Sequence, residues 1–465
     1  MTVDIVTSQA APYQTGTPAW WLRRLESELA NRLPDMQAYR DLVDDVHPAP
    51  DSVETSRKFK RIAGLATTNL TGLAVEATAE RMSVEGVRVG DEPDADKAVW
   101  DLLQRCDFDE SSQDAITSAL VYSRAFLSVE PPSGGRPARL HYEDPRQVVL
   151  ATWPDGSRRA ALKVFTDEWT GTTFGTLYTP NLVVKMERAG TPGVGQQYWM
   201  PRDLGRESAV SRNPLAEVPF FELQNKLTGS VRSEVAPLVI PQLRLNQVIF
   251  NTDSVAEYGA FRQKWATNIE VPRDSDGNTI APFEANIAKL FVAEGDGKFG
   301  DFNVSDMKPY IDLAQDVAAH IARLSRVPIT YFLSNVANLS ADALALLVSG
   351  LVLKCRRRVT GYEPGIEGAI RLALRTMGDA RAQAANIEVK WADMETRSRA
   401  QDADAAVKLT QGENPVISPQ TAQEKYLGMS QTERDRDDAW RRRQRGSGVL
   451  EALRSAAGGA DVSTD

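Results

Sequence analysis

The sequence predicts an α+β fold in which short strands come first and long helices follow. Between residues 125 and 200, apolar and polar side chains alternate in short runs that Pro, Gly, Asn and Asp separate. From Pro237 onward, apolar side chains instead recur every three or four residues. A period of two is typical of strands and a period of 3.6 is typical of helices. The content of 42% hydrophobic and 25% charged residues is ordinary for a folded protein.

The first predicted element is a helix over residues 18–46. Its apolar side chains recur at spacings of four, at Trp21, Leu25 and Leu29. Pro34 is expected to kink or divide this helix, because proline lacks the backbone donor that a helix interior needs. Residues 1–19 lack the basic and apolar segments of a signal peptide, so we expect a disordered arm there.

More helices and a set of short strands are expected before residue 230. Helical spacing is found in residues 56–81, 94–106 and 108–123. Alternation predicts strands at residues 82–89, 125–129, 138–142, 147–152, 159–169, 174–178, 182–187 and 196–200. Turn-forming residues separate the strands after residue 125, as in an antiparallel meander, so the first 230 residues are expected to form an α+β domain.

Two helices joined by an insert are predicted next. The helix over residues 236–261 would be about 39 Å long at a rise of 1.5 Å per residue. The second helix covers residues 309–326 and stops before Pro328. Between them, the turn-forming residues 274–278 and the glycines just before Lys298 predict a hairpin-like insert.

A much longer helix is predicted from the N-cap residue Ser340 to about Gly378. Its apolar stripe consists of Leu344, Leu347, Val348, Leu351 and Cys355. Internal breakers are expected to kink it without ending it, at Gly361, Pro364 and Gly365. A strand at residues 387–391 and charged helix over 398–455, broken at 413–415, precede a tail that we expect to be disordered.

The charge balance argues against a protein that holds DNA tightly. Lys and Arg number 54 and Asp and Glu number 63, which gives a net charge of −9. A protein that grips phosphates is normally basic. Either nucleic acid is irrelevant to this chain, or the chain lets DNA slide without holding it.

Cysteine and hydropathy patterns add two exclusions. Cys106 and Cys355 are too far apart in sequence to suggest a local redox or zinc pair, and we expect reduced thiols in helices. No run approaches the roughly 18 apolar residues that a membrane span requires, so no membrane partner is expected.

Motifs for catalysis or for a cofactor are missing from the sequence. It has no phosphate-binding loop, no H-E-x-x-H, no C-x-x-C and no G-x-S-x-G elbow. The histidines His47, His141 and His320 occur singly, and we interpret them as surface or core residues rather than metal ligands. Residues 274–277 resemble part of a calcium loop, but the third acidic position and the distal glutamate are missing. We therefore expect no catalytic residue, metal or cofactor.

The run Arg356-Arg357-Arg358 is the strongest nucleic-acid candidate by charge alone. Three successive helical residues fan over roughly 200° of the helix circumference, so they cannot all face one partner. We favour a solvated or subunit-facing stretch of helix over a DNA site.

Several segments resemble the portal proteins of tailed bacteriophages of the siphophage type. Asn69 leads into residues 74–77 and 80–86, which are similar to a family passage where a helix feeds a strand. Residues 178–180 form a Tyr-Thr-Pro turn, and residues 218–225 are similar to the segment before the first stem helix. Residues 323–328 followed by 338–343 resemble the family's tunnel-loop passage. Each piece is short, but their order is specific.

The resemblance implies a portal-protein fold with named regions. These are a disordered arm (1–19), an α/β wing (20–235), stem helices (236–261 and 309–326), an α/β clip (262–308), a tunnel loop (327–339), a long kinked wing helix with a strand (340–394), a helical crown (395–455) and a disordered tail (456–465). It also implies a homo-oligomer of about 12 subunits around double-stranded DNA.

The resemblance further implies partners and functional positions. The partners are the terminase large subunit, the major capsid and scaffolding proteins, and a head-completion adaptor, in the virion and in the host cytoplasm during assembly. The expected channel residues are Pro328, Thr330, Tyr331, Ser334, Asn335 and Asn338 in the tunnel loop, with Arg323 and Arg326 at the end of the stem. The expected docking residues of the clip are Asp274, Asp276, Asn278 and Lys298.

Two other classes of protein stay open at this point. One is a metal-dependent nucleic-acid-processing enzyme whose acidic residues bind Mg²⁺. The other is a different phage head–tail structural protein such as an adaptor, although adaptors are shorter chains.

Overall fold

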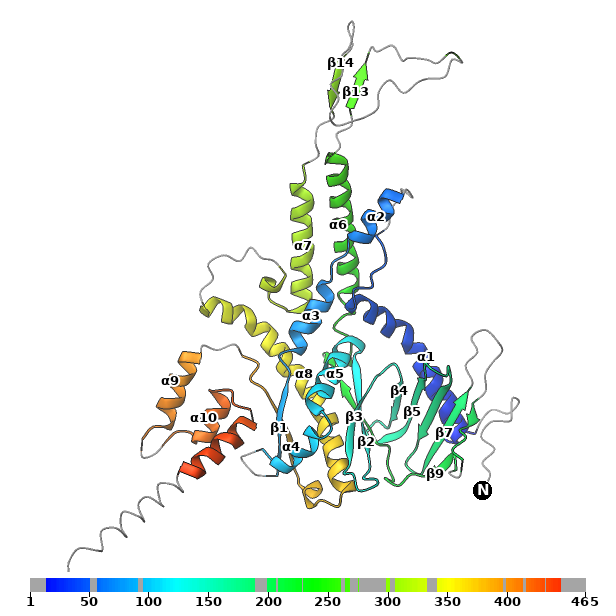
Figure 1. Ribbon diagram of the computed structural model, residues 1–465, viewed down its shortest axis with the longest axis vertical. Coiled ribbons are helices and arrows are strands. Elements are labelled where there is room, and N and C mark those ends of the chain that lie inside the picture. The colour runs from blue at the N-terminus through cyan, green and yellow to red at the C-terminus, as the bar shows by residue number, and fades with distance from the viewer. Residues whose placement is uncertain are drawn as a thin grey trace, which may run out of the picture.

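The structure, a computed structural model, shows two upright helices on a broad base of helices and sheets (Figure 1). It describes residues 14–50, 57–90, 95–188, 199–205, 208–227, 229–260, 264–267, 275, 298–301, 306–332, 341–395, 399–412, 415–430 and 432–444. The predicted arm and tail lie mostly or wholly outside these residues.

The predicted meander is confirmed from residue 148 onward as an antiparallel sheet with the strand order β4-β5-β6-β7-β8, to which β9 adds beside β7. Its first two predicted strands, at 125–129 and 138–142, belong to a different sheet. The strands are β4 (Val148–Thr152), β5 (Arg158–Thr166), β6 (Thr173–Tyr178), β7 (Leu182–Arg188), β8 (Met200–Pro201) and β9 (Val210–Arg212). Helix α1 (Pro18–Val43) covers one face of this sheet and buries Trp21, Leu25 and Leu29 against Leu162 and Leu177. The helix continues through Pro34 without a break.

The remaining strands form a second sheet, small hairpins and a ribbon that is distant in sequence. The second sheet has the order β10-β2-β3, with β10 (Phe220–Gln224), β2 (Arg124–Glu130) and β3 (Arg139–Glu143). In the ribbon, β1 (Val84–Val89) pairs with β15 (Ile387–Trp391), about 300 residues further along the chain. A short hairpin joins β11 (Lys226–Leu227) to β12 (Ser230–Val231).

The main core lies around the long helix α8 (Ala341–Thr376). The helices α3 (Leu70–Ala79), α4 (Lys97–Gln104) and α5 (Phe108–Tyr122) supply further core residues, and the 3-10 helix η2 (Ala380–Gln383) packs beside α8. The predicted helical pair at 94–106 and 108–123 is thereby confirmed. Pro364 lies inside α8, which continues past it as the sequence predicts.

The upright helices are α6 (Val239–Ala260) and α7 (Lys308–Ser325), which pack side by side in opposite directions (Figure 1). Their bounds agree with the predicted helices 236–261 and 309–326 to within three residues. Beyond their upper ends, β13 (Lys264–Thr267) pairs with β14 (Lys298–Asp301). Most of the predicted hairpin-like insert lies outside the described residues.

The C-terminal helices form a small unit at the side of the base. They are α9 (Arg399–Thr410), α10 (Pro419–Lys425) and a further helical stretch at residues 432–444. Glu424 connects this unit to the ribbon, because its carboxylate lies 2.6 Å from Arg88, 3.0 Å from Lys390 and 2.7 Å from Arg434. A polar cavity of about 300 Å³ lies beside this ion cluster, between β1, β15 and α10.

Three local predictions from the sequence are wrong, and each has a physical reason. The single helix at 56–81 is divided into α2 (Arg57–Leu65) and α3, because Asn69 caps α3 by accepting a hydrogen bond of 2.7 Å from the Gly72 amide. The strand at 159–169 ends at Thr166, because the Asp167 carboxylate accepts the Trp169 amide at 3.0 Å and turns the chain. Cys106 lies in the turn between α4 and α5 and not in a helix.

Candidate functional site

The described part of the pair α6 and α7 has buried apolar side chains near the base. These are Leu245 and Val248 on α6, with Val317, Ala318, Ile321 and Ala322 on α7. Phe250 of α6 packs instead with Ile62 and Ala63 of α2. Large apolar side chains elsewhere on α7 are exposed, namely Ile311, Leu313 and Leu324. A helix with apolar residues on more than one face normally has more than one packing partner.

A turn follows α7, and the structure describes it as far as residue 332. Arg326 ends the helix in the left-handed conformation, with φ at 58°. Val327 and Pro328 are buried, and the 3-10 helix η1 (Ile329–Tyr331) follows. The Tyr331 hydroxyl is at the surface and accepts a hydrogen bond of 3.1 Å from Arg81 Nη2.

The expected channel residues therefore have different surroundings. Arg323, Arg326 and Tyr331 are exposed near the base of the helix pair, and Thr330 is half-buried. Pro328 is enclosed by its own chain, so its side chain does not present a surface, contrary to expectation. The other expected channel residues, Ser334, Asn335 and Asn338, lie outside the described residues.

The expected docking residues of the insert are described only at one position. Lys298 is exposed at the start of β14 and lies opposite Thr267 on β13. Asp274, Asp276 and Asn278 lie outside the described residues.

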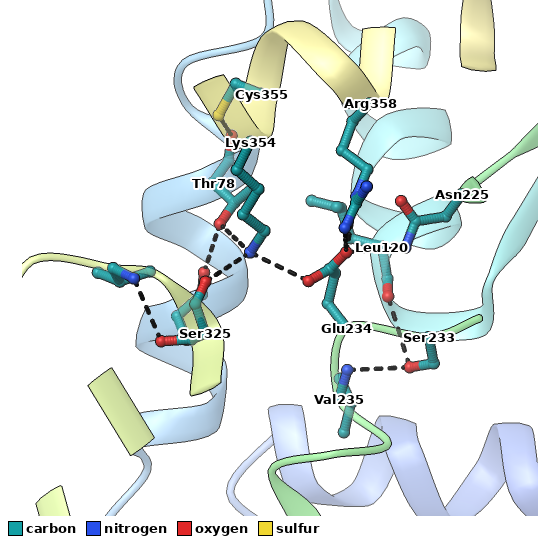
Figure 2. Close-up of polar contacts among 12 residues, drawn as sticks. Thr78, Leu120, Asn225, Ser233, Glu234, Val235, Ser325, Lys354, Cys355 and Arg358 are labelled. Carbon is teal, nitrogen blue, oxygen red and sulfur yellow. Dashed lines mark hydrogen bonds and ion pairs between the residues drawn. The ribbon is translucent and has the colours of Figure 1, made fainter. Parts of the chain in front are cut away.

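A buried cluster of charges joins the helix pair to the long helix, and the sequence interpretation missed it. We call Glu234, Lys354 and Arg358 the junction cluster (Figure 2). Arg358 Nη2 lies 2.6 Å from Glu234 Oε1, and Lys354 Nζ lies 3.1 Å from Glu234 Oε2. Lys354 Nζ also donates to the Ser325 carbonyl at 2.9 Å, and thereby satisfies a carbonyl at the end of α7.

Neutral groups complete the hydrogen bonds of the junction cluster. Lys354 Nζ donates to Thr78 Oγ1 of α3 at 3.2 Å, and Asn225 Nδ2 donates to Glu234 Oε1 at 3.1 Å. The cluster thus connects α3, α7, α8 and the segment that leads into α6 (Figure 2). Fully satisfied buried ions of this kind fix a geometry, because removing one partner leaves a charge without compensation.

The electrostatics of the junction cluster favour an ionised carboxylate. Burial alone would raise the pKa of Glu234, but the adjacent Lys354 ammonium and Arg358 guanidinium together lower it. Nearby, burial raises the pKa of the Cys355 thiol to about 11, so this thiol stays protonated at neutral pH. Neither group has the properties of a general base or nucleophile, so the arrangement is structural.

The interpretation of the arginine run needs a correction at one position. Arg358 is buried in the junction cluster, whereas Arg356 is exposed and pairs with Glu395. A signal for this was present in the sequence. Lys354 and Arg358 are four residues apart and flank the buried Cys355, so they lie on the side of the helix that faces the core.

Neither a metal cluster nor a membrane span is found in the part of the chain that the structure describes. In those residues, no group of three or more His, Cys, Asp or Glu side chains is placed to hold a metal ion. Within the same residues, every helix is too short or too polar to cross a bilayer.

The described elements combine antiparallel sheets, two upright helices and a third, much longer helix. A family model described as "Phage portal protein, SPP1 Gp6-like" matches residues 30–445. The chain therefore belongs to this family of phage portal proteins.

Similar proteins agree with this assignment. The portal protein of Mycobacterium phage D29 is 25% identical over 406 residues, which cover 84% of this chain and 82% of the relative. The portal protein of Mycobacterium phage L5 is 26% identical over 422 residues, with the same coverage of 84% and 82%.

Two solved structures are similar to the chain at lower identity. A chain from the neck of an empty gene transfer agent particle, computed with C6 symmetry, has a TM-score of 0.45 and 14% identity and covers 80% of this chain and 88% of its own length. A chain from the neck of the native particle, computed with C12 symmetry, has a TM-score of 0.43 and 14% identity, with coverage of 85% and 98%.

Proposed function

We propose that this chain assembles into a ring of about twelve copies that surrounds double-stranded DNA at one vertex of a phage capsid. The observation that carries the proposal is the portal family match over residues 30–445. DNA would pass through the ring during packaging and again during ejection. The protein would act as a structural channel and not as an enzyme.

The described elements suit the regions of such a subunit. The stem would be α6 and α7, the clip would contain β13 and β14, and the crown would contain α9, α10 and residues 432–444. The wing would include α1, the sheets, α3 to α5 and the long helix α8. The tunnel loop, residues 327–339, would follow the stem at its base.

The chemistry of the channel has to let a polyanion move. Residues 327–339 contain no charged side chain, and the whole chain carries −9. Each phosphate that is neutralised in a ring strengthens binding to DNA, so an uncharged loop suits sliding contact better than a basic one. Thr330, Ser334, Asn335 and Asn338 would form weak, exchangeable hydrogen bonds with phosphates.

Two basic side chains lie at the edge of the uncharged loop. Arg323 and Arg326 are exposed near the end of α7, and they would steer DNA or pair with a neighbouring copy. The first role acts on DNA and the second acts on the contact between copies, so a measurement with DNA and a measurement of ring stability separate them. Replacing both by glutamine would reduce DNA-dependent effects in the first case and ring stability in the second.

The partners of the ring follow from its regions. The clip, with Asp274, Asp276, Asn278 and Lys298, would dock the terminase large subunit and later the head-completion adaptor. The wing would face the major capsid and scaffolding proteins. The ring would be built in the host cytoplasm and would remain in the virion at the portal vertex.

Particle mass and shape test the proposal directly. Mass photometry of the purified full chain should give a species of roughly 600 kDa, as expected for twelve copies of a 51.1 kDa chain. Negative-stain images should show rings with a central hole. A species near 51.1 kDa that cleaves DNA only when Mg²⁺ is added would instead support the metal-dependent enzyme.

A further inference from the structure

The glycines of α8 fall into two groups with different surroundings. A Cβ atom at Gly361 would lie 2.6 Å from the Gln224 carbonyl oxygen, and one at Gly365 would lie 2.7 Å from the Glu222 carbonyl oxygen. At Gly368 it would lie 2.6 Å from the Phe221 ring. These three glycines therefore let the backbone of α8 approach β10 closely.

Gly350 has no such explanation among the residues that the structure describes. A Cβ atom there would meet none of their atoms within 4 Å. Glycine in the middle of a helix lowers helix stability relative to alanine, so its presence needs a reason. The contacts of the described residues give none.

The side chains next to Gly350 on the same face are apolar and uncovered. Leu346 is four residues before it and 75% exposed, and Leu353 is three residues after it and 64% exposed. This spacing places all three on one side of the helix. We call Leu346, Gly350 and Leu353 the open stripe of α8.

The open stripe has the shape of a surface where a second helix can cross α8. A residue without a side chain between two leucines makes a notch, and ridges of another helix can enter such a notch at close distance. Large exposed apolar side chains that share one face mark interaction sites on soluble proteins. An apolar notch offers no donors to phosphates, so it does not suit DNA.

We infer that the open stripe of α8 is part of the contact between neighbouring copies of this chain. The inference rests on the proposed ring, in which each copy joins its neighbours through two different surfaces. The open stripe is the first surface, and a helix of the next copy occupies it across Gly350.

The charges at the edge of the stripe favour a second copy as the occupant. Arg357 continues the stripe four residues after Leu353, is exposed, and forms no ion pair with any described residue. On α7, the exposed Asp316 likewise forms no ion pair within the described residues and lies three residues after the exposed Leu313. One chain thus presents an apolar stripe with a basic end and, on another helix, apolar side chains next to a free carboxylate.

Substitutions at the stripe separate assembly from folding. Gly350→Leu adds a side chain where the single chain has open space, so it should leave the thermal midpoint of the subunit unchanged or higher. The same substitution should reduce the ring population at least tenfold by mass photometry at a fixed protein concentration. Leu346→Asp should also reduce it at least tenfold, because it buries a charge in the contact.

A matched control lies on the sheet of the base. Trp169 is 97% exposed in the turn after β5, so Trp169→Asp introduces the same carboxylate at an exposed apolar residue away from α8. The control should keep the rings of the unmodified chain. Circular dichroism of all variants checks that each subunit is folded.

The outcomes distinguish the inference from the proposed function. Loss of rings in Gly350→Leu and Leu346→Asp, with rings kept in Trp169→Asp, supports the inference. Unmodified rings that persist in both stripe variants overturn it, and leave the ring itself intact with another occupant for the stripe. An unmodified chain that remains a single 51.1 kDa subunit overturns the proposed ring and the inference with it.

Discussion

The two halves of α8 share one continuous helix but have opposite surroundings. In the C-terminal half, Gly361 and Gly365 bring the helix backbone against β10, and Tyr362 is fully buried. In the N-terminal half, Leu346 and Leu353 are exposed and Gly350 faces open space. In Figure 1, the C-terminal end of α8 runs into the base, and its N-terminal end points outward on the side of α9.

The contrast shows which part of α8 is covered by contacts within the single chain and which part is not. The buried half accounts for its glycines, its apolar residues and its charges by contacts within the chain. In the N-terminal half, the described residues leave the face with Leu346 and Leu353 uncovered, whereas the opposite face is buried at Leu351 and Cys355. The junction cluster lies at the boundary, where Lys354 and Arg358 hold the helix to Glu234.

The largest expected change in the free energy of unfolding is at the junction cluster. Arg358→Ala should lower the free energy of unfolding by about 3 kcal/mol, because a buried carboxylate loses one of its two cations. Arg356→Ala, two residues earlier, is the matched control and should cost about 0–1 kcal/mol, because its pair with Glu395 is exposed. Urea denaturation at one protein concentration measures both. Equal decreases in the free energy of unfolding for the two variants would show that the buried ion pair of Arg358 does not hold α8 in place.

The glycines allow the two halves to be compared by one type of substitution. Gly365→Ala should destabilise the protein by about 1–3 kcal/mol, because the new methyl group meets the Glu222 carbonyl. Gly350→Ala should instead stabilise the single subunit by about 0.4–1 kcal/mol through the unfolded chain. Thermal unfolding measures both signs. A destabilising Gly350→Ala in a monomeric sample would mean that the N-terminal half of α8 has an unseen partner within the chain.

Acid should weaken the buried half through Glu234. The pKa of this carboxyl is lowered in the folded protein, so its contribution to stability is complete above the unfolded value of about 4.3. That contribution is lost as the pH falls through the lower folded value. The thermal midpoint of Glu234→Gln should therefore be lower than that of the unmodified protein at neutral pH. It should also fall less between roughly pH 5 and pH 3, where the carboxyl of the unmodified protein becomes protonated. Parallel curves for the two proteins would contradict the assigned role.

The smallest expected change in the free energy of unfolding is at Arg326, at the end of α7. Arg326 has a positive φ of 58°, a conformation that glycine adopts without strain. Arg326→Gly should raise the free energy of unfolding by up to about 1 kcal/mol, whereas Arg326→Ala should not. Differential scanning calorimetry of the two variants measures this. A destabilising Arg326→Gly would mean that the arginine side chain has a structural contact here.

Local patterns in the sequence predicted most of the elements correctly. The spacing in residues 309–326 and the alternation in 174–178 gave the correct helix and strand, because both depend on one buried face. The pairing of β1 with β15 could not be predicted, because no local pattern records a partner about 300 residues away. Strand β10 was also missed, since the Val218–Asn225 segment was recognised only by its resemblance.

The candidate site was predictable to a smaller extent. Arg323 and Tyr331 are exposed in the single chain and Pro328 is buried, so the uncharged loop alone did not indicate which of its side chains reach a surface; the channel role of all three stays a prediction. Glu234 was missed because its partners lie on α8, more than 100 residues further along the chain. Leu347 belongs to the predicted apolar stripe but is exposed, because helical spacing alone does not show which apolar residues of a helix are covered.

Hydrogen exchange along α8 tests the central claim most directly. In rings of the unmodified chain, amides of residues 346–350 and of residues 361–374 should both be protected. In single subunits of Leu346→Asp, residues 361–374 should keep that protection and residues 346–350 should lose it, because the projecting end has lost its neighbour. Equal exchange of residues 346–350 in rings and in single subunits would contradict the claim that this end of α8 is completed by another copy.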